Sequence, residues 1–161
     1  MTQRIVTVTV LVLALVVLWR FWPSDERRIQ QLVQEMADAL QPGAGESDLA
    51  RVGRLAPLAR ALADDVVVDG PASARGRDQV MAVAMQAGRV TPRLTVIVRD
   101  IDVRVEPGRT TATALVTVSI GGVSDGTGNS WNDITELQFD LRRHEDVWTV
   151  VRIAPAPALR P

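Results

Sequence analysis

The pattern of apolar and polar positions divides the chain into an uninterrupted apolar run, a region of helical periodicity and a region of alternating strands. Residues 5–19 carry no charge. A helix over residues 5–22 would be about 27 Å long, close to the ~30 Å hydrocarbon core of a bilayer. Aromatic and basic side chains that suit a membrane interface gather at its end, namely Trp19, Arg20, Phe21 and Trp22. The pattern predicts a single transmembrane anchor over residues 1–23.

The alternative for this run is a cleaved secretory signal. Cleavage needs small residues after the apolar stretch, whereas residues 19–24 read WRFWPS, which is bulky and charged. We therefore expect residues 1–22 to be retained. The excess of arginine after the run favours a cytoplasmic domain, but one arginine followed by an apolar run is also how export signals begin. Of the two, we expect a single-pass inner-membrane protein with a periplasmic domain.

Apolar residues at helical spacing predict three helices after the anchor. The first begins after Ser24, a good N-cap, and ends at residue 40. The second begins near Ser47 or Asp48, and Pro57 is expected to break or kink it. The third covers residues 76–89, after a short buried strand at 66–68.

After Pro92 the apolar period changes from that of a helix to that of strands. Val98 and Ile101 belong to two apolar series of opposite parity, which predicts a β-bulge at Arg99–Asp100 and a strongly curved sheet. Further strands are expected at 112–120, 137–141 and 147–154, with a glycine-rich loop at 121–130 and a proline-rich tail at 155–161. The order predicts an α+β fold, with three helices packed on a strongly curved, mostly antiparallel sheet.

Composition excludes several classes of function. Eighteen basic and nineteen acidic residues are interspersed without a basic tract, which argues against nucleic acid as a partner. The chain has no cysteine, and its one histidine, His144, falls in a predicted turn. This excludes ordinary zinc sites and a Ser-His-Asp triad. We expect no cofactor and no metal.

Two segments carry a resemblance to a known family. Residues 62–84, LADDVVVDGPASARGRDQVMAVA, and 137–153, LQFDLRRHEDVWTVVRI, resemble the nuclear transport factor 2-like superfamily of cone-shaped α+β domains, which includes ketosteroid isomerase. The layout is similar to that of bacterial proteins in which one apolar span carries such a domain outside the inner membrane. The resemblance implies a domain over 24–154 with a pocket at the open end of the cone. Family members use this pocket for catalysis, ligand binding or protein contact.

Asp65, Trp131 and Asp133 are the possible pocket residues. Relatives that resemble ketosteroid isomerase combine an aspartate base with a tyrosine hydroxyl and a neutral acid, and this chain has no tyrosine. Asp65 matches the region before the first strand, where an aspartate also ends helices and starts turns. Trp131 beside Asp133 suits either a pocket mouth or the anchoring of a loop.

The expected function is a non-enzymatic accessory or scaffold subunit of a larger membrane assembly, for example in transport, secretion, electron transfer or photosynthesis. Its partners would be membrane lipid and other membrane-protein subunits. The possible partner contacts lie in the glycine-rich loop and the tail, at Gly121, Gly122, Asp125, Gly126, Pro155 and Pro157. The alternatives are a periplasmic domain that binds a small apolar ligand, and a lyase or isomerase of the cone fold. The absence of tyrosine and cysteine argues against the lyase or isomerase, so we expect that the protein is not an enzyme.

Overall fold

The computed structural model describes residues 24–43, 45–70, 73–91, 93–123 and 130–157. The predicted anchor at 1–23, with its interface residues Trp19, Arg20, Phe21 and Trp22, lies outside these ranges, as do Asp125 and Gly126. Among the described residues, no helix combines the length and apolar character needed to cross a membrane. Membrane anchoring and periplasmic location therefore stay predictions.

The three predicted helices are present. They are α2 (Asp25–Leu40), α3 (Asp48–Ala61) and α4 (Arg77–Val90). Ser24 and Ser47 cap α2 and α3, each accepting a hydrogen bond from a backbone N–H three residues on. Pro57 lies inside α3 and does not break it, so the break that the sequence allowed for does not occur. The helix continues because Leu55 and Leu58, on either side of the proline, are buried in the core.

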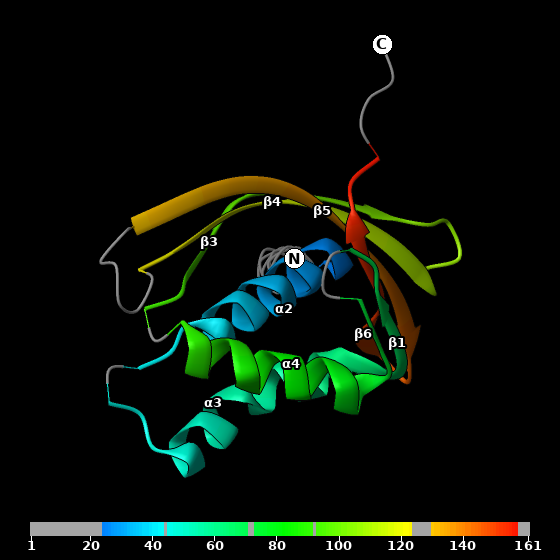
Figure 1. Cartoon of the computed structure of the whole chain (residues 1–161). Helices are drawn as coiled ribbons and strands as arrows, with labels where there is room; N and C mark the ends of the chain where they lie inside the picture. Colours follow the sequence, from blue (N-terminus) through cyan, green and yellow to red (C-terminus); the bar gives the residue numbers. More distant parts are fainter. Residues whose placement is uncertain (1–23, 44, 71–72, 92, 124–129, 158–161) are drawn as a thin grey trace, which may run out of the picture.

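One six-stranded mixed sheet faces the helices. Its strands are β1 (Leu62–Val68), β2 (Ala74–Arg75), β3 (Thr95–Val105), β4 (Thr111–Val123), β5 (Ser130–His144) and β6 (Val147–Pro155). Their order is β2-β1-β6-β5-β4-β3, and only β1 and β6 pair in parallel. Figure 1 shows β3, β4 and β5 arching over α2, with α3 and α4 on the far side of that helix. The predicted α+β layout of helices on a curved sheet is confirmed.

The predicted bulge in β3 is also confirmed. Val98 pairs with Val118 and Asp100 pairs with Thr117, so Arg99 is the extra residue. Val98 and Ile101 consequently both pack against the hydrophobic core. A bulge increases local twist and bends the strand, which helps β3 to follow the curve around α2.

Part of the predicted glycine-rich loop is strand. Gly121 and Gly122 belong to β4, where they pair with Asn132 and Trp131 of β5. Pro155 still pairs with Leu137 of β5, so part of the predicted tail is strand β6. Pro157 lies just beyond β6. The predicted partner contacts at Gly121, Gly122 and Pro155 are therefore positions in the sheet.

Candidate functional site

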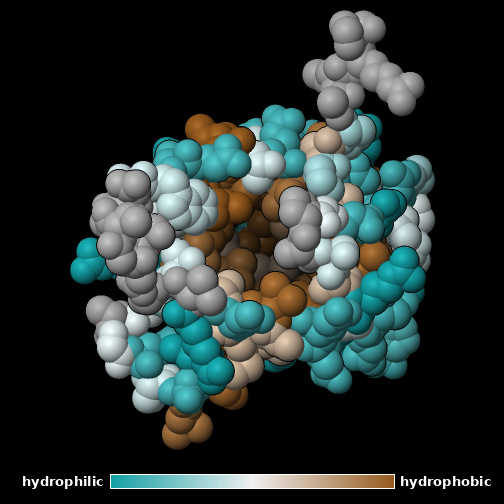
Figure 2. Space-filling model, viewed as in Figure 1, coloured by the Kyte–Doolittle hydropathy of each residue, from teal (hydrophilic) through white to brown (hydrophobic). Residues whose placement is uncertain are grey.

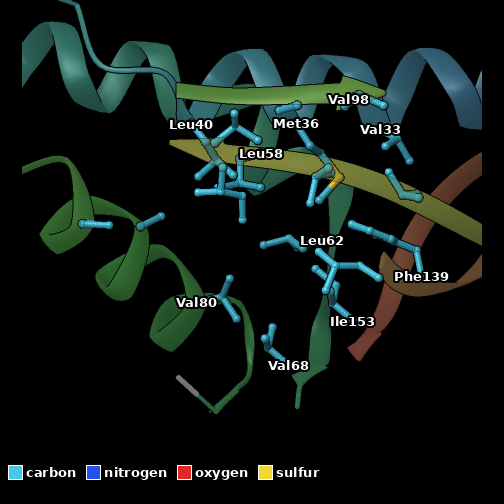
Figure 3. A pocket seen from close by; sticks show the side chains of 18 of the residues that line it. Val33, Met36, Leu40, Leu58, Leu62, Val68, Val80, Val98, Phe139 and Ile153 are labelled. Atoms are coloured by element: carbon cyan, nitrogen blue, oxygen red, sulfur yellow. The ribbon is translucent and has the colours of Figure 1, made fainter. Parts of the chain in front are cut away.

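An apolar cavity of about 300 Å³ lies between the concave face of the sheet and the three helices. Figure 2 shows it as a brown hollow in the face of the molecule seen in Figure 1. Figure 3 shows how the side chains from α2, α3, α4 and the strands surround it. Its wall consists of Val33, Met36, Ala37, Leu40, Leu58, Leu62, Val68, Val80, Val83, Ala84, Ala87, Leu94, Val96, Val98, Val116, Val118, Ile120, Leu137, Phe139 and Ile153.

The helical and strand periodicities explain how these residues reach one space. On α4, Val80, Val83, Ala84 and Ala87 are spaced by three or four residues and share one face of the helix. On β4, alternate residues point to the concave face, so Val116, Val118 and Ile120 all line the cavity. Ala84 and Ala87 are too short to reach across to the sheet, which leaves space between the two layers.

The cavity wall carries no hydrogen-bonding side chain among the described residues. An apolar wall of this kind favours apolar molecules over water, because water against it makes fewer hydrogen bonds. The cavity is at the lower end of the size range of ligand pockets, roughly 300–1,000 Å³. The wall itself therefore supplies shape and apolar contact, but no proton donor or acceptor.

Trp131 and Asp133 lie at the rim of this cavity and outside its wall. In the pairing of β4 with β5, Asp133 lies opposite Ile120 and Trp131 lies opposite Gly122. Side chains alternate along a strand, so Trp131 and Asp133 point to the same concave face as Leu137. Both side chains are exposed. A Cβ built on Gly122 would lie 3.1 Å from two atoms of the Trp131 indole, so that ring covers the glycine.

Asp65 lies away from the cavity wall. Its carboxylate accepts a hydrogen bond of 3.1 Å from Arg142, and both side chains are more than half exposed. The neighbouring Asp64 forms an ion pair with Arg77, whose guanidinium also donates to the backbone carbonyl of Leu62. Both aspartates thus pair with surface arginines, and the geometry gives neither contact with the apolar space.

The other charged contacts also lie outside the cavity. Asp25, at the start of α2, accepts hydrogen bonds from Arg143 and from the indole of Trp148. Glu46 accepts two hydrogen bonds from Arg54, and this contact holds the pKa of Glu46 below its usual value of 4.5. In the parts of the chain that the structure describes, no three histidine, cysteine or acidic side chains come together to hold a metal ion.

The family resemblance implied a pocket, but sequence reasoning did not identify its wall residues or two rim residues, Thr135 and Thr91. Thr135 lies between Asp133 and Leu137 on the concave face of β5, opposite Val118. The alternation that identified Leu137, Phe139 and Leu141 extends back to this position, so the signal was present in the sequence. Thr91 follows α4, and its methyl group lies 2.8 Å from the position of a Cβ on Gly122.

No protein-family model and no curated protein matches this chain. Solved structures do. A provisionally assigned aromatic ring hydroxylase from Novosphingobium aromaticivorans has 19% identity and a TM-score of 0.67 over 85% of this chain and 90% of that one. A hexachlorocyclohexane dehydrochlorinase, LinA-type3, from Novosphingobium barchaimii has 14% identity and a TM-score of 0.62 over 83% and 90%. An uncharacterized protein with a cystatin-like fold from Caulobacter vibrioides has 18% identity and a TM-score of 0.61 over 78% and 84%.

At these identities the likeness establishes the fold alone. The chain has the nuclear transport factor 2-like cone fold, as the sequence resemblance implied. The comparison also corrects the prediction that the protein is not an enzyme. The fold gives no ground for that prediction, because a dehydrochlorinase is built on the same cone fold. A missing tyrosine argues only against chemistry of the ketosteroid isomerase type.

Proposed function

We propose that this domain binds a small apolar molecule inside the cone cavity. The observation that carries the proposal is the wall of the cavity, which is formed entirely by aliphatic side chains and one phenylalanine around about 300 Å³ of space. Each methylene group transferred from water into such a site contributes about 0.8 kcal/mol. A chain of several methylenes would therefore bind without any polar contact inside. The predicted alternative of apolar ligand binding is the one that this geometry supports.

A pair of alanines on α4 provides the test. Ala84 lines the cavity, whereas Ala82, half a turn away, is exposed on the outside of the same helix. Ala84→Phe places a ring in the apolar space, and Ala82→Phe adds the same ring on the outside. The full chain would be titrated with phenylnaphthylamine, a neutral apolar fluorophore. Binding to the apolar run at 5–19 is common to both variants and cancels in the comparison.

We expect saturable binding to the unaltered chain and to Ala82→Phe, and loss of at least about tenfold in affinity for Ala84→Phe, since a filled cavity has no room for the probe. Thermal unfolding of both variants would confirm that the fold is intact. Equal affinities for the two variants, or no saturable binding to the unaltered chain, would refute the proposal.

A further inference from the structure

The cavity and its rim have different chemistry along one continuous face of the sheet. On β5, Leu137 belongs to the apolar wall, whereas Thr135 and Asp133 continue the same face towards the rim. Their cross-strand partners on β4, Val118 and Ile120, both line the cavity. Directly opposed residues in an antiparallel pair have Cβ atoms about 5 Å apart. The Asp133 and Thr135 side chains therefore begin within about 5 Å of the cavity wall.

Trp131 limits the space at this end of the sheet. Its indole covers Gly122, with the methyl group of Thr91 close to the same glycine. A molecule that leaves the cavity along this face passes Thr135 and Asp133 before it meets the indole. Among the described residues, Asp133 takes part in no ion pair, unlike Asp65, Asp64 and Asp69. Its carboxylate is thus available as an acceptor at the exit from the apolar space.

These features constrain the polar end of any ligand. The interior cannot satisfy a polar group, so a head group must remain at the rim, where water and the polar side chains can reach it. A carboxylate or phosphate placed beside Asp133 would be repelled, whereas an ammonium group would be attracted and could donate hydrogen bonds to the carboxylate. A hydroxyl would donate one hydrogen bond without the charge attraction.

We propose that the ligand is a single-chain aliphatic amine, with its hydrocarbon chain in the cavity and its ammonium group at Asp133. The inference rests on the proposed function and assigns Asp133 as the residue that selects the head group. Thr135 adds a hydroxyl beside it on the same face.

Decylamine, decanol and decanoate test this assignment, because they share one chain and differ in the head group. Each would compete with phenylnaphthylamine for the full chain at low salt. We expect decylamine to displace the probe best and decanoate worst. The preference for decylamine over decanoate should be about fivefold, as expected for a solvent-accessible carboxylate that attracts one head and repels the other. It should shrink as salt is added.

Asp133→Asn should reduce this preference to about twofold or less while leaving decanol displacement unchanged. Asp102→Asn is the matched control, since Asp102 lies on a strand of the same sheet but pairs with Leu115, on the convex face. It should leave the preference unaltered. Equal displacement by the three compounds, or an equal preference in Asp133→Asn and the unaltered chain, would overturn the head-group assignment. Failure of all three to displace the probe would instead count against the proposed function.

Discussion

At the scale of single residues, Gly122 shows how one missing side chain shapes the rim of the cavity. A Cβ at this position would lie 2.8 Å from Cγ2 of Thr91 and 3.1 Å from two atoms of the Trp131 indole. Contacts this short would force the backbone or its neighbours to move. Only glycine lets the indole lie against strand β4, so the place of Trp131 at the rim depends on Gly122.

Two glycine-to-alanine substitutions with opposite expected effects test this dependence. Gly122→Ala should displace the indole and lower the free energy of unfolding by about 1–3 kcal/mol, the range typical of overpacking. Gly53→Ala, in α3, has nothing within 4 Å of the added Cβ and should raise it by about 0.5–1 kcal/mol, because alanine restricts the unfolded chain and favours the helix. Urea unfolding measures both changes, and tryptophan emission should shift only in Gly122→Ala. A stable Gly122→Ala variant with unchanged emission would show that the rim tolerates the extra carbon.

At the scale of elements, Arg54 of α3 contacts both α2 and the loop between the two helices. Arg54 of α3 donates from Nε and Nη2 to the two carboxylate oxygens of Glu46, at 2.8 and 3.1 Å, and also donates to the backbone carbonyl of Ala39 near the end of α2. Leu40 and Leu58, which line the cavity, lie close to this contact in the sequence. The hydrogen bond to Ala39 therefore joins α3 to α2, two elements of the cavity wall, and the ion pair with Glu46 holds the Arg54 side chain in place for it.

The pKa of Glu46 predicts how this contact responds to acid. Hydrogen bonding from Arg54 lowers the folded-state pKa below the usual 4.5, so the unfolded chain binds the proton more readily than the folded one. The contribution to stability is complete above pH 4.5 and is lost as the pH falls below that value, through the folded-state pKa. Glu46→Gln should flatten the fall in stability over this acid range, whereas Glu35→Gln, on the exposed face of α2, should not. Parallel acid profiles for the unaltered chain and Glu46→Gln would contradict this account.

The elements also show what local patterns can predict. The three helices and the β3 bulge follow from the spacing of apolar residues and from capping serines, which are local properties of the sequence. The loop predicted at 121–130 is wrong at residues 121–123 and 130, which are glycine-rich or polar and form strand because β4 and β5 pair with each other there. The break that was considered at Pro57 does not occur, because burial of the neighbouring Leu55 and Leu58 outweighs one lost hydrogen bond.

At the scale of the whole molecule, the cavity arises from a mismatch between layers that local patterns do not record. Val116 and Val118 would alternate with outward-facing residues in the same way if the core were filled with side chains. Only the distance between the sheet and the helices decides whether side chains fill the interior or leave a cavity. The sequence did suggest Trp131 and Asp133 as residues of a pocket mouth. It could not show that Asp65 would instead pair with Arg142, a residue 77 positions away.

The start of the domain and its last hairpin meet at Asp25. Its side chain is only 9% exposed and accepts from Arg143 at 3.3 Å and from the indole Nε1 of Trp148 at 3.3 Å. The Arg143 guanidinium lies 6.0 Å from the centre of the Trp148 ring. One carboxylate thus fixes the first turn of α2 to residues more than 110 positions later. Removing the charge of Asp25 would weaken its contacts with Arg143 and Trp148, and Arg143 would keep its ion pair with Asp146.

Asp25→Asn and Glu26→Gln separate this contact from a general effect of charge. Both residues lie in the first turn of α2, where the attraction between either carboxylate and the helix dipole stabilises the helix by about 0.3–1 kcal/mol. Only Asp25 is buried against the hairpin, so Asp25→Asn should lower the free energy of unfolding by about 1–3 kcal/mol and Glu26→Gln by no more than the dipole term. Urea unfolding would measure the two losses in free energy of unfolding, provided that the dependence of this free energy on urea concentration is the same in both variants. Equal losses in the two variants would mean that the helix dipole, and not the contact with Arg143 and Trp148, accounts for the role of Asp25.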